Sequence, residues 1–144
     1  MNEPKKLIDT PSQTAGPFLH IGCAPRITGI NIFKSELGLT PFQDISDNEA
    51  INIKGKIYDG NDGPITDAMI ETWQCDENGN YSSNQGFARI VTDFKTGEYQ
   101  LKTIRPGNKI NTDGSLSASY ITFWIVARGM NRPLITRMYF LEND

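Results

Sequence analysis

The sequence predicts an all-β domain that folds as an antiparallel β-sandwich. The core of the sandwich is expected over residues 51–144, and an irregular N-terminal arm and segment over residues 1–50. Three observations predict this class. After residue 50, apolar and polar residues alternate over short segments, which are rich in β-branched and aromatic side chains. Turn-forming glycine, asparagine and aspartate separate these segments at short intervals. A chain of 144 residues is long enough for one such domain with its own core.

The first strand is expected at residues 51–58, INIKGKIY. Ile51, Ile53 and Ile57 fall on one face of this segment and polar residues on the other, which is the period-two pattern of a half-buried strand. The following stretch DGNDGP, residues 59–64, combines two glycines with a proline and predicts a tight turn.

The middle of the chain predicts three further strands. Residues 68–74, AMIETWQ, form the second strand, and the polar run CDENGNY at 75–81 leaves it as a loop. Residues 87–93 and 98–104 flank the stretch FKTG, in which Gly97 can adopt a positive φ. These two segments are therefore interpreted as a β-hairpin.

The last third predicts a long loop and two strands. RPGNKINTDGS at 105–115 is the loop, and YITFWIVAR at 120–128 is mostly apolar, as expected of a central strand. A tight turn at GMN leads into another strand, RPLITRMYF, at 132–140. Ahead of the sandwich, INIFKSELG at 30–38 fits either a short helix or an extended crossing.

Charge and hydropathy exclude several classes of partner. The chain has 17 acidic and 14 basic residues, a net charge of −3, and no cluster of arginine and lysine. This pattern weighs against nucleic acid or an anionic membrane as a partner. No apolar run approaches the roughly 18 residues of a membrane-spanning helix. The start MNEPKKLIDT has no apolar segment typical of a signal peptide, so we expect a cytoplasmic protein.

The cysteine and histidine content argues against a structural zinc site. Cys23 and Cys75 lie far apart, no CxxC pair is present, and His20 is the only histidine. A structural disulfide is not expected in the cytoplasm. Both cysteines are therefore interpreted as packing or surface residues.

Two blocks of the sequence resemble the intradiol ring-cleaving dioxygenases. They are TPSQTAGPFLHIG at 10–22 and GKIYDGNDGPITDAMIETWQCDENGNY at 55–81. The later blocks TDFKTGEYQLKTIRPG at 92–107 and ITFWIVARGMNRPLITRMYF at 121–140 fit the same family in the same order, and within it the alpha-type subunits of the enzymes that cleave protocatechuate. The middle block is less specific, because a similar pattern occurs in transthyretin-like modules.

The resemblance implies a fold, a cofactor and a reaction. The fold is a β-sandwich of the intradiol dioxygenase and transthyretin-like kind. The cofactor is a non-haem ferric ion held by two tyrosines and two histidines of a partner, the catalytic beta-type subunit. The reaction inserts both atoms of dioxygen between the hydroxylated carbons of 3,4-dihydroxybenzoate and yields 3-carboxy-cis,cis-muconate, in the β-ketoadipate pathway. Family members continue beyond the position of Asp144, so we expect the sandwich core to be incomplete at its C-terminal end.

This chain does not carry the residues of that iron site. Tyr81 matches the position of one tyrosine ligand, but the sequence NKIN at 108–111 replaces the second tyrosine. Tyr120 and Thr122 stand where catalytic chains have their two histidines, and Ser117 stands where they have an arginine near the substrate. A lone phenol with a pKa of about 10 binds iron poorly at neutral pH. We therefore expect no catalytic residue and no metal in this chain.

The resemblance implies a different contribution, which is substrate binding by the arm. Thr14, Gly16 and Pro17 match arm positions that close the substrate pocket of a neighbouring beta-type subunit, and Arg128 matches an arginine near the substrate carboxylate. Glycine permits close backbone approach, proline is rigid, and a guanidinium can grip a carboxylate with two hydrogen bonds. The alternatives are an arm that only packs on its own sandwich and an arginine in water or in a structural ion pair.

The other conspicuous side chains are expected to be structural. His20 is interpreted as making a hydrogen bond within the arm or a contact between subunits, and not as a proton-transfer group. Trp73 and Trp124 are expected to pack in the core or at an interface. Glu71 and Arg137 alternate with apolar residues, which favours surface or interfacial ion pairs.

Three functions remain open at this point. The first is an alpha-type, non-iron-binding subunit that needs a catalytic partner and is inactive alone. The second is a stand-alone transthyretin-like binding or interaction module without catalysis, and the third is a degenerate, shortened homologue without function. The motif PSQTAGP at 11–17 favours the first, because a binding module has no use for it.

Overall fold

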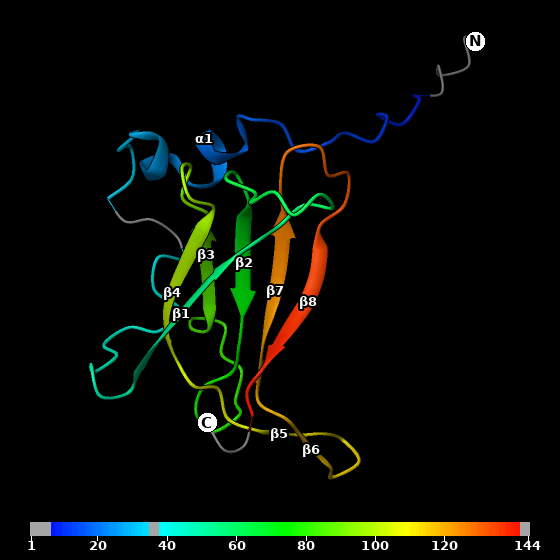
Figure 1. Cartoon of the computed structure of the whole chain (residues 1–144). Helices are drawn as coiled ribbons and strands as arrows, with labels where there is room; N and C mark the ends of the chain where they lie inside the picture. Colours follow the sequence, from blue (N-terminus) through cyan, green and yellow to red (C-terminus); the bar gives the residue numbers. More distant parts are fainter. Residues whose placement is uncertain (1–6, 35–37, 142–144) are drawn as a thin grey trace, which may run out of the picture.

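The computed structural model describes residues 7–34 and 38–141 (Figure 1). A five-residue helix and a turn of 3₁₀-helix precede the strands. In chain order the elements are α1 Leu19–Cys23, the 3₁₀ turn Pro25–Thr28, β1 Ala50–Lys56, β2 Met69–Trp73, β3 Phe87–Val91, β4 Glu98–Ile104, β5 Lys109–Ile110, β6 Leu116–Ser117, β7 Tyr120–Val126 and β8 Leu134–Tyr139.

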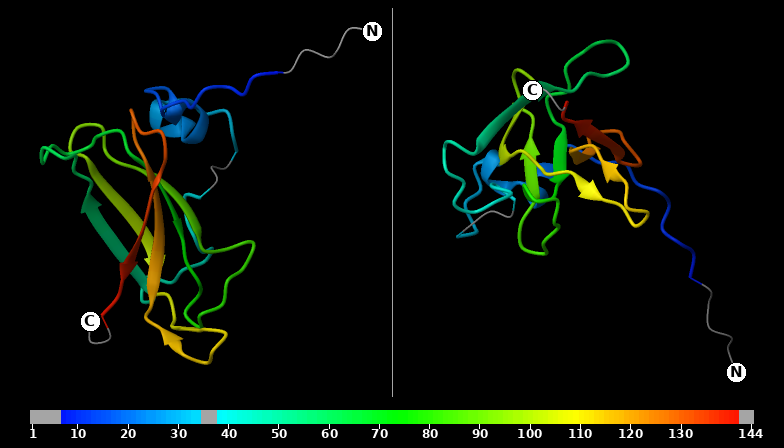
Figure 2. Two further views of the ribbon diagram at one scale, coloured as in Figure 1. Left: turned by 90° about the vertical axis from the view of Figure 1, so that its right-hand side faces the viewer. Right: turned by 90° about the horizontal axis from the view of Figure 1, so that it is seen from below.

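The strands form two layers and one short ribbon, all antiparallel. The larger sheet has the order β3-β2-β7-β8, and the pair β1-β4 forms the second layer. This pair crosses one face of the larger sheet, and β5 and β6 extend from the far end (Figures 1 and 2). The predicted antiparallel all-β class is confirmed, and β7 has the predicted central place between β2 and β8.

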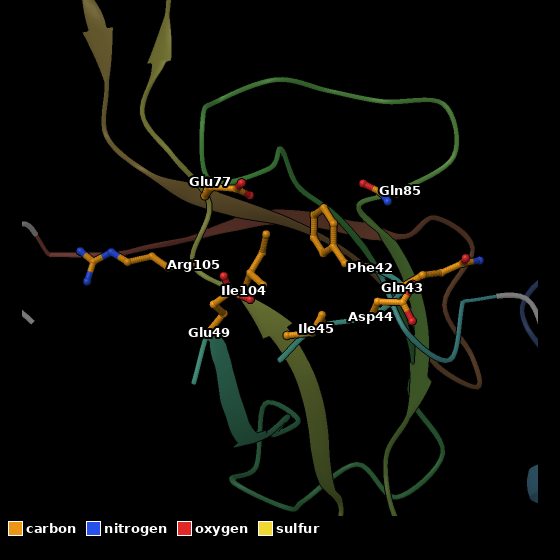
Figure 3. Close-up of a pocket in the computed structure, with 9 residues that line it drawn as sticks. All are labelled: Phe42, Gln43, Asp44, Ile45, Glu49, Glu77, Gln85, Ile104 and Arg105. Atoms are coloured by element: carbon orange, nitrogen blue, oxygen red, sulfur yellow. The ribbon is translucent and has the colours of Figure 1, made fainter. Parts of the chain in front are cut away.

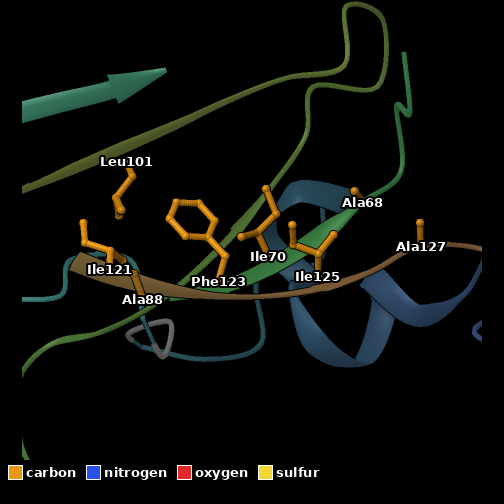
Figure 4. Close-up of a cluster of buried hydrophobic side chains, with 8 residues drawn as sticks. All are labelled: Ala68, Ile70, Ala88, Leu101, Ile121, Phe123, Ile125 and Ala127. Atoms are coloured by element: carbon orange, nitrogen blue, oxygen red, sulfur yellow. The ribbon is translucent and has the colours of Figure 1, made fainter. Parts of the chain in front are cut away.

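The core lies between the two layers. On β1, Ile51 and Ile53 are half-buried while the polar residues between and after them are exposed, as the period-two pattern predicted. Leu101 of β4, only 2% exposed, points toward Ile121 and Phe123 of β7 (Figure 4). The buried cluster consists of Ala68, Ile70, Ala88, Leu101, Ile121, Phe123, Ile125 and Ala127.

The predicted hairpin of residues 87–93 and 98–104 is wrong in its pairing. The turn forms: Gly97 has φ +69°, and the Asp93 amide donates to the Glu98 carbonyl at 2.8 Å. The two strands then separate, since β3 pairs with β2 and β4 pairs with β1. The turn therefore links the two layers. The alternation of apolar and polar residues shows only that each strand buries one face. It does not show which neighbouring strand the backbone bonds to.

Three further segments differ from expectation or extend it. The predicted loop at 105–115 contains β5, which pairs with β6 in a two-stranded ribbon. The arm, expected to be irregular, contains α1 and the 3₁₀ turn. The segment 30–38 forms neither helix nor strand in its described part, and residues 35–37 lie outside the described residues. Among the helices described, none is long and apolar enough to cross a membrane.

Candidate functional site

The N-terminal arm is joined to the turn between β7 and β8. The Ala15 amide donates to the Met130 carbonyl at 3.0 Å, and the Gly129 amide donates to the Ala15 carbonyl at 2.9 Å. Gly129 adopts φ +88°, a conformation that favours glycine. These reciprocal bonds bring the residues on either side of Ala15 next to Arg128, and the arm runs beside the turn in Figure 1.

The structure thus brings together the four residues that the sequence singled out for substrate binding. Thr14, Gly16, Pro17 and Arg128 are all exposed. A methyl group added at Gly16 would meet no atom within 4 Å, so this chain alone does not require glycine there. The space beside Gly16 is therefore open in this chain.

Arg128 is held by a carboxylate that the sequence analysis did not single out. Its Nε lies 3.1 Å from Oδ2 of Asp67, with the arginine side chain 64% exposed and the aspartate 24% exposed. The register of β2 and β7 pairs Met69 with Val126, and its continuation by two residues sets Asp67 opposite Arg128. No local signal in the sequence reveals this pairing, because it follows from the packing of two distant strands.

His20 is buried beside this ion pair. It is 4% exposed and stacks on Phe94 with the ring centroids 5.5 Å apart. No hydrogen bond joins either ring nitrogen to the arm in the described part of the chain, so the predicted hydrogen bond within the arm is wrong. Burial lowers the pKa of His20, and the charge of nearby Asp67 opposes this effect. The contact between subunits stays a prediction.

The positions that match the family's iron ligands lie at the opposite end of β7. The Tyr81 and Tyr120 hydroxyls are 3.5 Å apart. Thr122 follows Tyr120 by two residues and so shares its face of the strand. Burial, and then the Tyr120 hydroxyl, raise the pKa of Tyr81, which disfavours the phenolate that a ferric ion needs.

The surroundings of the two phenols also oppose a cation. The Lys109 ammonium lies 5.5 Å from the centre of the Tyr81 ring, and the Arg137 guanidinium lies 4.4 Å from that of Tyr120. Within residues 7–34 and 38–141 no group of three histidine, cysteine, aspartate or glutamate side chains could hold a metal. One histidine and a phenol with a raised pKa do not fit a ferric ion held by two tyrosines and two histidines, which is the set that the resemblance implies.

The structural residues divide into confirmed and corrected predictions. Glu71 accepts a hydrogen bond from Arg89 Nε at 2.8 Å, so its predicted ion pair is confirmed. Arg137 has no carboxylate partner among the described residues and lies on Tyr120, so a surface ion pair is not found and an interfacial one stays a prediction. Trp73 is 38% exposed and stacks on Tyr81 at 6.2 Å, which excludes the core and leaves the interface as a prediction.

A cavity of about 380 Å³ lies elsewhere, beside the start of β1 (Figure 3). In this view Phe42 lies between Glu77 and Gln85, and Glu49 lies below Glu77. The guanidinium of Arg105 points away from Phe42 and donates a hydrogen bond to the Leu141 carbonyl. Its lining combines no nucleophile with a base, so we assign it no chemistry.

Comparisons with known proteins agree with the sequence motifs. The family model described as "Dioxygenase" matches residues 34–144. The chain is 38% identical to the protocatechuate 3,4-dioxygenase alpha chain of Pseudomonas putida, over 93% of this chain and 70% of that protein. It is 31% identical to the alpha chain of the same name from Burkholderia cepacia, over 93% and 71%.

Solved structures share the fold. The 3-chlorocatechol 1,2-dioxygenase of Rhodococcus opacus superposes with a TM-score of 0.62 at 21% identity, over 70% of this chain. The catechol 1,2-dioxygenase of Pseudomonas arvilla gives 0.63 at 20% identity, over 73% of this chain. The matched region covers 47% and 40% of those two proteins, so this chain spans less than half of each.

Proposed function

The chain belongs to the intradiol dioxygenase family, and from that premise we propose that it is an alpha-type subunit which binds no iron. In this proposal it helps to form the substrate pocket of a hetero-oligomer in the cytoplasm. The ferric iron belongs to a catalytic beta-type partner, where it supplies the oxygen chemistry of ring cleavage. The substrate is 3,4-dihydroxybenzoate, which the assembled enzyme converts to 3-carboxy-cis,cis-muconate.

The observation that carries the proposal is the joining of the arm to the β7–β8 turn. It gathers Thr14, Gly16, Pro17 and Arg128 on one exposed surface at one end of the sheet. A backbone without side chains, a rigid proline ring and a guanidinium together suit a flat aromatic acid. Because the arm is already bonded in place, little ordering entropy is lost when a ligand binds.

The distance along β7 supports a second chain as the source of the reacting centre. Tyr120 begins β7 and Arg128 lies two residues beyond its end. At about 3.3 Å per residue the strand alone spans about 20 Å. Arg128 therefore cannot touch a small ligand held at Tyr81 and Tyr120 of its own chain. A pocket that uses the arm and Arg128 must be completed by another polypeptide.

A stand-alone transthyretin-like binding module is the less favoured alternative. The similarity to alpha chains includes the arm, whereas the module alternative concerns only the sandwich. Such a module would also leave the exposed cluster around Arg128 without a role.

Co-expression with a beta-type chain tests the proposal. We expect a coloured ferric complex that consumes oxygen with 3,4-dihydroxybenzoate, while this chain alone stays colourless and inactive. In a second test the same complex carrying Thr14→Ala and Pro17→Ala should assemble and show a raised KM. Colour and oxygen uptake by the chain alone would refute the absence of iron, and failure to assemble would favour the binding module.

A further inference from the structure

We propose that Asp67 is a positioning residue for Arg128, so that the guanidinium presents its two Nη groups to the carboxylate of the substrate. The inference rests on the proposed function. It extends that function to Asp67, a residue to which the motifs and the sequence pattern assigned no role. It starts from the ion pair of 3.1 Å between Arg128 Nε and Asp67 Oδ2.

The side chain of Asp67 is attached to a rigid part of the core. The next residue, Ala68, is fully buried, and its amide donates to Oγ1 of Thr92 at 3.0 Å. The Thr92 amide donates in return to the Ala68 carbonyl at 3.0 Å. Aspartate has only a short side chain, so these bonds place its carboxylate with little freedom. The carboxylate of Asp67 is 24% exposed, so it is fixed by the core and still accessible to the Arg128 side chain.

The Arg128 side chain is far more exposed than that of Asp67. Arg128 follows the buried Ala127, but its own side chain is 64% exposed. An arginine in water samples many rotamers and loses that freedom on binding a ligand. The contact with Asp67 removes part of this freedom before the ligand arrives, which lowers the entropic cost of binding.

The atoms used in the pair leave the binding groups available. A guanidinium has five N–H donors, of which Nε carries one and the two Nη groups carry four. Asp67 is engaged at Nε, and within the described residues no other carboxylate pairs with Arg128. The two Nη groups can then donate two parallel hydrogen bonds to the two oxygens of one carboxylate.

The negative charge of Asp67 could instead weaken substrate binding, and the test must distinguish this effect from positioning. An anion beside Arg128 weakens its attraction for another anion. If this effect exceeded the gain in orientation, removal of the Asp67 charge would lower KM. A purely structural pair, largely exposed, would contribute little and would not discriminate between substrates.

The test compares two substrates in the assembled complex. For Asp67→Asn, we expect KM for 3,4-dihydroxybenzoate to rise roughly two- to tenfold, the range for ordering one flexible side chain. The kcat should change little, and KM for catechol, which lacks the carboxylate, should stay the same. In an Arg128→Gln background, Asp67→Asn should add no further effect. Asp62→Asn, the same chemical change in an exposed turn, is the matched control.

Several outcomes would overturn the proposal. They are an unchanged or lowered KM in Asp67→Asn, an equal rise for both substrates, and a rise that persists without Arg128. If Arg128→Gln raises KM but Asp67→Asn does not, positioning is refuted and the proposed function stands. If neither variant changes KM, both are refuted.

A second measurement needs no partner subunit. In the isolated 144-residue chain with labelled arginine, the Nε resonance of Arg128 should differ from that of Arg132, an exposed arginine of the same turn, because Asp67 Oδ2 lies 3.1 Å from Arg128 Nε. Asp67→Asn should move the Arg128 resonance toward that of Arg132. The same resonance position in the unmodified chain and in Asp67→Asn would refute the pair.

Discussion

Truncation of Arg128 to alanine is expected to raise the KM of the assembled enzyme for 3,4-dihydroxybenzoate. The side chain is 64% exposed and pairs with Asp67 through Nε alone, so the cost of the change to folding should be below about 1 kcal/mol. A hydrogen bond to a charged group contributes about 1.5–3 kcal/mol net. Since about 1.4 kcal/mol corresponds to tenfold, KM should rise about 10- to 100-fold.

The assay is oxygen uptake at varied substrate concentration, with the melting temperature recorded for each variant. Arg128→Lys keeps the charge but loses the planar fork, so an intermediate KM is expected. Arg132→Ala, in the same exposed turn, is the matched control and should leave KM unchanged. An unchanged KM in Arg128→Ala would remove Arg128 from the site, and an equal rise for catechol would refute carboxylate recognition.

Three further predictions concern the fold, the buried histidine and the metal. Leu101→Ala should lower the free energy of unfolding by about 2–5 kcal/mol in urea titration, because the side chain is 2% exposed in the core. Lys102→Ala, on the solvent side of the same strand, should lower it little. A similar loss in both variants would contradict the faces assigned to β4. Burial lowers the pKa of His20 below its unfolded value of about 6.5, so the unfolded chain binds more protons there and stability should fall as pH drops through 6.5. The charged group that acts on this ring is Asp67, which pairs with Arg128, and His20→Leu should remove that part of the pH dependence of the urea midpoint; an identical dependence would exclude His20. Ferric ion added to the chain alone at neutral pH should produce no visible phenolate-to-iron band, because the chain has one histidine where the site needs two, and the raised pKa of Tyr81 further disfavours the phenolate; a band that disappears in Tyr81→Phe would contradict this.

The strands and turns were predictable because their signals are local. The alternation on β1 and the position of Gly97 depend on neighbours in the sequence, and both agree with the structure. The partner of β4 was not predictable in the same way. The alternation on β4 shows which face is buried, but it does not show whether its backbone edge bonds to β3 or to β1.

The candidate site divides in the same manner. Motifs pointed to Thr14, Gly16, Pro17 and Arg128, and the bonds of Ala15 bring these residues together. Asp67 was not predictable as part of the site, because an aspartate that follows a turn carries no local signal of a function. Its relation to Arg128 follows only from the register of β2 and β7.

The sequence by itself determined that these 144 residues hold one histidine, fewer than the two that the resemblance assigns to the iron site. One histidine cannot provide two, and that count does not depend on folding. The tertiary structure decided where the remaining chemistry lies. It joined the arm to the β7–β8 turn, set Asp67 beside Arg128, and separated both from Tyr81 and Tyr120 by the length of β7. The physical reason is that side-chain chemistry is a local property, whereas neighbourhood across strands follows from the pairing and burial of distant segments.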